Sequence, residues 1–149
     1  MILYRLTKPV YANDFSGNGS KLYGGRWNSK GNAMVYMASS RSLAVLEVLV
    51  HLDPLLIPGK YTMVTIEAPD DFEMAVLSGL PQGWNETPDD YNLKPIGDTF
   101  LSDNKHLLLQ VPSLIVPQEF NYLANPTHKL APKLKVLKTE TFSFDKRLL

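Results

Sequence analysis

The chain of 149 residues contains no cysteine. This absence excludes disulfides, a thiolate nucleophile, thiolate-bound zinc and iron–sulfur clusters. An excess of charge of either sign is also missing, because 15 lysines and arginines balance 15 aspartates and glutamates. Nucleic-acid binding through a broadly basic surface is therefore disfavoured, and any anion site has to be built from a few placed groups.

Long hydrophobic runs are absent as well. The most apolar stretch, LAVLEVLVHL (43–52), is too short to span a bilayer and contains a glutamate. The amino-terminal residues show no basic region followed by a long apolar one. We therefore expect a cytoplasmic protein that is neither exported by a recognisable signal nor inserted in a membrane.

The hydrophobic pattern predicts a single α+β domain over residues 1–149. A helix is expected from Ser39 or Ser40 to Asp53, and a short helix is expected to begin with Asp98 as its cap. Residues 13–31 hold five glycines and are expected to be an irregular excursion, and 69–97 to be mostly irregular. Strands are predicted at 2–6, 33–39, 61–68, 72–77, 107–113, 113–117 and 134–145, with 61–68 central or near-central. Because helices and strands do not alternate regularly, a doubly wound parallel sheet is not expected.

Glu47 has the most unusual predicted environment. At helical spacing its neighbours include Leu43, Ala44 and Val50, so the carboxylate projects from a mainly apolar face. Burying an unpaired carboxylate costs several kcal/mol, so Glu47 should be paired with a cation or face a cleft. The alternative is that Glu47 lies at the rim of the buried stripe of the helix.

Arg26 follows Gly24 and Gly25 in the segment GGRWNSKG (24–31). Glycines let the backbone approach a ligand closely, and a guanidinium offers a planar set of donors that suits a phosphate or a carboxylate. The alternative is a turn in which Arg26 stacks on Trp27.

Two further candidates carry hydroxyl groups. Tyr36 lies within a predicted strand, where it can equally be a core aromatic. Ser113 follows Pro112 without a G-x-S-x-G motif, so we interpret it as a hydrogen-bond donor or a plain strand serine and not as a nucleophile. The three histidines show no ligand spacing, and no metal site is expected.

Several blocks of sequence, taken in order, resemble one known family. They are YRL (4–6), FSGNGS (15–20), GGRWNSKG (24–31), MVYMASSRSLAVLEVLVHL (34–52), GDTFL (97–101), VPSLIVPQEFNYLANPTH (111–128) and FSFDKRLL (142–149). Together they closely resemble the RES-domain family, the toxins of RES–Xre toxin–antitoxin pairs, which is named for an arginine, a glutamate and a serine. The resemblance extends from Tyr4 to Leu149 and is weakest at 69–97.

The resemblance implies an ADP-ribosyltransferase-like fold, with a split β-sheet core, an NAD-binding cleft and a few short flanking helices. By position, Arg26, Glu47 and Ser113 match the residues that name the family, and Tyr36 matches its active-site tyrosine. Arg26, Tyr36 and Ser113 would contact NAD+, the substrate. Two more residues of the segment 24–31, the arginine loop, are expected to contribute to the same site: Gly25 and Asn28. Trp27 and Asn28 would anchor that loop.

The resemblance further implies a toxin that cleaves the nicotinamide–ribose bond of NAD+ by hydrolysis or phosphorolysis and so arrests growth. One alternative is a mono-ADP-ribosyltransferase that modifies a cellular protein, and another is a non-catalytic module that binds a nucleotide or a partner. The expected partner is an Xre-like helix-turn-helix antitoxin that occludes the active site, with a homodimer inside the complex. No direct contact with nucleic acid is expected.

Overall fold

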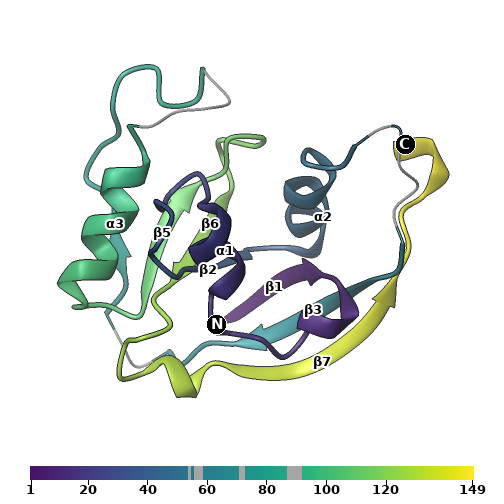
Figure 1. Cartoon of the computed structure of the whole chain (residues 1–149), viewed down its shortest axis with the longest axis horizontal. Helices are drawn as coiled ribbons and strands as arrows, with labels where there is room; N and C mark the ends of the chain where they lie inside the picture. Colours follow the sequence, from purple (N-terminus) through teal and green to yellow (C-terminus); the bar gives the residue numbers. More distant parts are fainter. Residues whose placement is uncertain (54, 56–58, 71–72, 87–91) are drawn as a thin grey trace.

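The computed structural model describes residues 1–53, 55, 59–70, 73–86 and 92–149. In these residues seven strands form one sheet with the order β4-β5-β6-β2-β1-β3-β7 (Figure 1). The strands are β1 (Ile2–Thr7), β2 (Val35–Ala38), β3 (Tyr61–Glu67), β4 (Ala75–Val76), β5 (Leu108–Pro112), β6 (Phe120–Ala124) and β7 (Lys135–Phe142). Neighbouring strands are antiparallel except β4 and β5, which are parallel. The predicted α+β class is confirmed.

Three α-helices flank the sheet, and their bounds are α1 (Asn18–Tyr23), α2 (Arg41–Leu49) and α3 (Lys94–Asp103). Within the described ranges there are also three 3-10 turns, at Pro9–Tyr11, Ala131–Lys133 and Lys146–Leu148. In Figure 1, α2 lies near the junction of β1 and β2, whereas α3 lies beyond β5 at the opposite end of the molecule. None of the helices in the described ranges is long and apolar enough to cross a membrane.

The sheet is split between β1 and β2. These two strands share one residue pair, Tyr4 with Ala38, whereas β1 pairs with β3 along its whole length and β2 does so with β6. Strands that diverge after a single pair expose side chains on both sides of the gap. Residues 4–7 of β1 and 35–38 of β2 accordingly line a large cleft.

Apolar side chains fill the molecule on both sides of this split. Leu3, Val64 and Ile66 are at most 1% exposed and belong to a cluster that extends from β1 and β3 to side chains of β2, β5 and β6. On the other half, Leu109 and Leu123 form a second cluster with side chains from α3 and the arginine loop. Burial of large aliphatic side chains contributes about 1.5–3 kcal/mol each, so these clusters hold the two halves of the sheet in place.

Most of the predicted strands are found, with ends shifted by one to three residues. The helix predicted after Ser39 or Ser40 is α2, and Ser40 caps it by accepting a hydrogen bond from the Leu43 amide at 3.1 Å. It ends at Leu49, before the predicted stop at Asp53. The strand expected to be central, β3, is paired on both sides but lies one strand from the edge.

The strand predicted at 113–117 is wrong. The Ser113 hydroxyl accepts the amide protons of Ile115 and Val116, both at 3.1 Å, and this local bonding turns the chain. The turn joins β5 to β6 as a hairpin, and β6 at 120–124 was not predicted. A serine side chain therefore replaces the strand hydrogen bonds that the apolar pattern had indicated.

Two helical segments also differ from prediction. Residues 13–31 were expected to be irregular, yet they contain the short helix α1, whose ends are marked by Gly17 and Gly24 in positive-φ conformations. Helix α3 starts at Lys94, four residues before its predicted cap Asp98. Proline suits the first turn of a helix, and Pro95 occupies it here. The side chain of Asp98 accepts hydrogen bonds from Ser29 and Asn32 and does not cap the helix.

Candidate functional site

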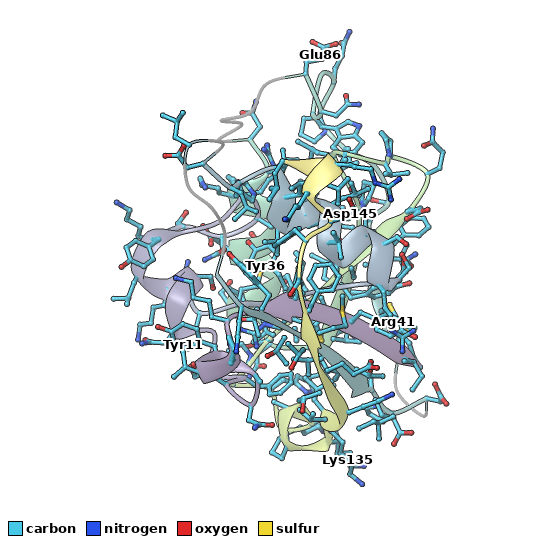
Figure 2. All side chains as sticks on the ribbon, turned by 90° about the vertical axis from the view of Figure 1, so that its right-hand side faces the viewer. Tyr11, Tyr36, Arg41, Glu86, Lys135 and Asp145 are labelled. Atoms are coloured by element: carbon cyan, nitrogen blue, oxygen red, sulfur yellow. The ribbon has the colours of Figure 1, made fainter. Side chains whose placement is uncertain are left out.

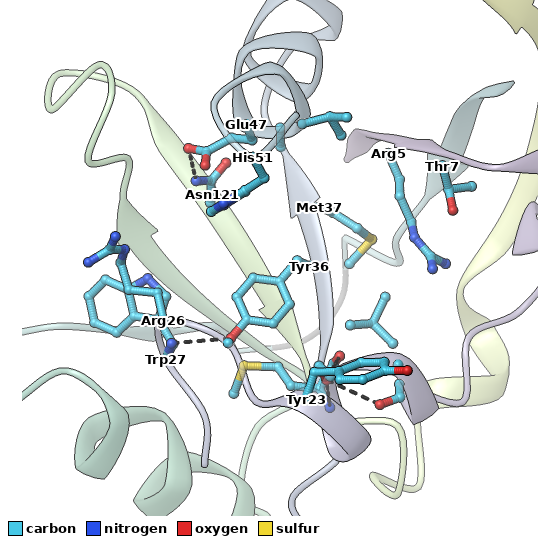
Figure 3. Close-up of a pocket in the computed structure, with 18 of the residues that line it drawn as sticks. Arg5, Thr7, Tyr23, Arg26, Trp27, Tyr36, Met37, Glu47, His51 and Asn121 are labelled. Carbon is cyan, nitrogen blue, oxygen red and sulfur yellow. Dashed lines mark hydrogen bonds between the residues drawn. The ribbon is translucent and has the colours of Figure 1, made fainter. Parts of the chain in front are cut away.

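A cleft of about 1100 Å³ opens where β1 and β2 diverge (Figure 3). A cavity of this size is sufficient for a dinucleotide, because sites for small molecules and cofactors typically enclose about 300–1,000 Å³. Of the sequence-predicted residues, Gly25, Arg26, Tyr36 and Glu47 line it. The other two are fully buried, as Asn28 and Ser113 each have an exposed fraction of 0%.

Glu47 projects from the last turn of α2 toward the cleft and is half-buried. Its Oε1 atom accepts two hydrogen bonds, from the Ser113 hydroxyl at 2.7 Å and from the Asn121 side-chain amide at 2.6 Å. Two donors on one oxygen fix the orientation of the carboxylate at the edge of the cleft. Both interpretations of Glu47 are therefore partly correct, since it borders the buried stripe and also faces a cleft.

Ser113 is buried and holds Glu47 through a hydrogen bond. Its hydroxyl has one proton and two lone pairs, and it donates to Glu47 while it accepts from the amides of Ile115 and Val116. Its own amide donates to the Glu119 carbonyl at 2.9 Å. The hydrogen-bonding capacity of Ser113 is thus used inside the protein, and the residue contacts the carboxylate instead of the cleft.

Tyr36 stands on β2 between the two sides of the cleft, near the middle of the molecule in Figure 2. Its hydroxyl donates to Asn28 Oδ1 at 2.5 Å and accepts from the Trp27 amide at 3.2 Å. Burial raises the pKa of Tyr36 well above its ordinary value, and the hydrogen bond from the Trp27 amide and the charge of Arg26 only partly oppose this. The phenol is therefore neutral at physiological pH and acts as a donor.

The arginine loop (residues 24–31) is packed directly on Tyr36. Gly25 allows this approach, because a Cβ there would lie 2.5 Å from the tyrosine oxygen and 2.7 Å from Asn28 Oδ1. Trp27 is 3% exposed and belongs to the apolar cluster below the loop. Asn28 donates to the carbonyls of Ser20 at 3.0 Å and Asn32 at 2.9 Å. The anchoring role expected of Trp27 and Asn28 is confirmed, while Arg26 stays at the cleft.

The cleft has further polar side chains that were not singled out from the sequence, among them Asn121, Arg5 and His51. Asn121 lies on β6, the strand that was not predicted, so nothing in the sequence indicated that it contacts Glu47. Arg5 lies on β1, and His51 follows the end of α2, one turn after Glu47. Arg5 could have been recognised as a charged residue within the otherwise apolar predicted strand 2–6. Its guanidinium donates to the Asp14 carbonyl at 2.5 Å, and burial lowers its pKa.

The charges of the cleft are arranged around Tyr36. Figure 3 shows Arg26 and Arg5 on opposite sides of this ring, with Glu47 above it. The described ranges contain no group of three His, Cys, Asp or Glu side chains that could hold a metal ion. The arrangement offers guanidinium groups for an anion and one fixed carboxylate for a developing positive charge.

Replacement of Tyr36 by Phe is expected to lower the free energy of unfolding by about 1–3 kcal/mol. The change leaves the buried Asn28 Oδ1 without the proton that it accepts at 2.5 Å, and an unsatisfied buried polar atom carries a penalty of this size. Urea denaturation followed by circular dichroism measures the difference. Tyr11→Phe, at an exposed ring, is the matched control and should be neutral. Equal midpoints for Tyr36→Phe and wild type would contradict the role given to this hydroxyl.

Comparison with known protein families gives a match over nearly the whole chain. A family model described as RES domain matches residues 2–145. The protein named Toxin Res from Pseudomonas putida is 43% identical over 150 residues, which cover 99% of both chains. The protein named Prs ADP-ribosylating toxin from a Sphingobium species is 42% identical over 142 residues, covering 93% of this chain and 88% of its own.

Among solved structures, the M. tuberculosis MbcT–MbcA toxin–antitoxin complex contains a chain of similar fold. The TM-score is 0.69, and the match covers 95% of this chain and 84% of that one at 18% sequence identity. At this identity the likeness concerns the fold, and it agrees with the split α+β architecture described above.

Proposed function

Because this chain belongs to the RES domain family, we propose that it is the toxin of a toxin–antitoxin pair and that it consumes NAD+. The reaction is cleavage of the bond between nicotinamide and ribose, with water or inorganic phosphate as the acceptor. The observation that carries the proposal is the Glu47 carboxylate, held by Ser113 and Asn121 at a cleft large enough for a dinucleotide.

The proposed chemistry starts with cleavage of the bond between the ribose C1′ and the nicotinamide nitrogen. When the C1′–N bond breaks, its electron pair neutralises the pyridinium nitrogen, and nicotinamide leaves. Positive charge then develops on the ribose, and the Glu47 carboxylate stabilises it or holds the ribose hydroxyls. An oxygen of the acceptor forms the new bond to C1′, and the proton of a water acceptor passes to solvent.

Binding of the substrate falls to the cationic and aromatic groups of the cleft. Arg26 and Arg5 lie on either side of Tyr36 (Figure 3) and supply donors for the diphosphate and ribose oxygens. The Tyr36 ring gives an apolar surface for the nicotinamide or the ribose. No cofactor is required, since NAD+ is the substrate.

A second candidate function is ADP-ribosylation of a protein in the cytoplasm. It is favoured by the 42% identity with the relative named Prs ADP-ribosylating toxin. The first half of the reaction is the same, and only the acceptor differs. In either case we propose an Xre-like antitoxin that occludes the cleft, in line with the toxin–antitoxin complex among the structural neighbours.

The experiment incubates the purified protein with NAD+, with and without phosphate, and follows nicotinamide release and the second product. Rapid release without a protein acceptor supports the proposal, and dependence on phosphate identifies a phosphorylase. Release only after addition of lysate, together with labelled protein on a gel, identifies the transferase. Absence of release in the presence of measurable NAD+ binding would overturn both and leave a binding module.

A further inference from the structure

Helix α3 contacts the arginine loop through side chains and through its backbone. The Asp98 carboxylate accepts three hydrogen bonds from this part of the chain: from the Ser29 amide at 2.9 Å, the Ser29 hydroxyl at 2.6 Å and the Asn32 side-chain amide at 2.9 Å. The Lys94 ammonium donates to the Gly25 carbonyl. Lys94 therefore binds the residue directly before Arg26, and Asp98 binds Ser29, three residues after it.

The backbone of α3 touches the loop between these side chains. An ideal Cβ built on Gly97 would lie 1.7 Å from the Trp27 carbonyl oxygen, so the helix and the loop are in direct backbone contact. Lys94, Gly97 and Asp98 are spaced i, i+3 and i+4 and share one face of the helix. This face meets the residues on either side of Arg26.

We propose that Asp98 is a positioning residue for Arg26, because its hydrogen bonds to Ser29 and Asn32 fix the loop that presents the guanidinium to the cleft. The inference rests on the proposed function, in which Arg26 binds the dinucleotide. It assigns α3, which lies outside the β2–α2 region that carries Tyr36 and Glu47, a part in substrate binding.

The location and the charge of Asp98 support this role. It is the fifth residue of α3, so it lies beyond the first turn, and the helix has no side-chain cap. Burial by itself raises the pKa of Asp98, but the hydrogen bonds from Ser29 and Asn32 and the charge of Lys94 outweigh this and lower it. The carboxylate is thus ionised at physiological pH, and its acceptors serve the loop instead of its own helix.

The first test is a double-mutant cycle on nicotinamide release with Arg26→Ala, Asp98→Ala and the pair. If Asp98 acts through Arg26, Asp98→Ala should raise the KM for NAD+ by about 10–100-fold, the scale on which a displaced binding group acts. The pair should lose little more than Arg26→Ala alone. Multiplicative losses in the pair, or an unchanged KM in Asp98→Ala, would overturn the proposal.

Two further variants guard against a loss of folding. Asp98→Asn keeps an oxygen for Ser29 and Asn32 and should stay within about 3-fold of wild type, because the Ser29 hydroxyl can reverse its role. Asp103→Ala removes an exposed carboxylate from the same helix and should leave the KM unchanged. An Asp98→Asn variant as impaired as Asp98→Ala would show that the hydrogen bonds are not what matters and would overturn the assignment.

Amide hydrogen exchange tests the same inference without any activity. Asp98→Ala should speed exchange at the Ser29 amide, whose acceptor it removes, whereas Asp103→Ala should not. If exchange speeds up but wild-type protein releases no nicotinamide, the proposed function fails and the hold on the loop stands. If exchange in residues 24–32 does not change, the positioning role itself is overturned.

Discussion

Replacement of Glu47 by Gln is expected to reduce NAD+ turnover by about 10²–10³-fold, the size of effect seen when one electrostatic stabiliser is removed from an active site. The amide has nearly the same shape, and its oxygen can still accept from Ser113 and Asn121. What is lost is the negative charge of the carboxylate. The measurement is the rate of nicotinamide release at saturating NAD+, together with the unfolding midpoint.

The control for this variant is Glu67→Gln, which removes an exposed carboxylate at the end of β3. It should match wild type in rate and stability. Turnover by Glu47→Gln at the wild-type rate would show that the carboxylate does not take part in bond cleavage. A large drop in the unfolding midpoint would instead indicate that Glu47 serves the fold.

Gly97→Ala is expected to lower the free energy of unfolding by at least about 2 kcal/mol. Alanine in a helix interior gains up to about 1 kcal/mol over glycine. Here the new methyl group would lie 1.7 Å from the Trp27 carbonyl oxygen, and overpacking costs about 3 kcal/mol or more when no side-chain rotation relieves it. The steric term therefore outweighs helix propensity, and α3 must move away from the arginine loop.

Urea unfolding of Gly97→Ala measures this effect, with Gly79→Ala as control because a Cβ at Gly79 meets nothing within 4 Å. If some folded protein remains, NAD+ binding by isothermal calorimetry should be weaker, since the loop carries Arg26. A variant as stable as wild type would mean that the helix and the loop separate readily, and then α3 could not position Arg26.

The sequence predicted the elements whose signal is local. Strand β3 has period-two alternation with β-branched residues, and Ser40 precedes an apolar helix as a typical cap. Arg26, Tyr36 and Glu47 were identified from the family pattern, and all three line one cleft. For β3 and α2 the deciding residues lie close together in the chain, so a pattern within a short window was sufficient, whereas the family pattern rests on blocks from the whole chain.

The predictions that failed concern side chains whose partners are distant in sequence. Aspartate is a typical helix-cap residue, but Asp98 accepts hydrogen bonds from Ser29, which lies 69 positions away in the chain. Ser113 was expected to be a hydrogen-bond donor or a plain strand serine, and it does donate to Glu47, but the strand predicted to begin with it is a turn. Nothing in the sequence pointed to Asn121, because its role is to donate a hydrogen bond to the same carboxylate, that of Glu47. A single sequence carries no information on such pairings.

The support of Glu47 also has a consequence for the timing of synthesis. The hydrogen bonds that fix its carboxylate come from residues 66 and 74 positions later in the chain. A nascent polypeptide on the ribosome can form α2 long before Ser113 and Asn121 are made, yet its carboxylate has no fixed orientation until both have been translated. Under the proposed function, the incomplete chain is harmless to the cell that makes it, and a partner has most of the translation time to be present before the first active molecule.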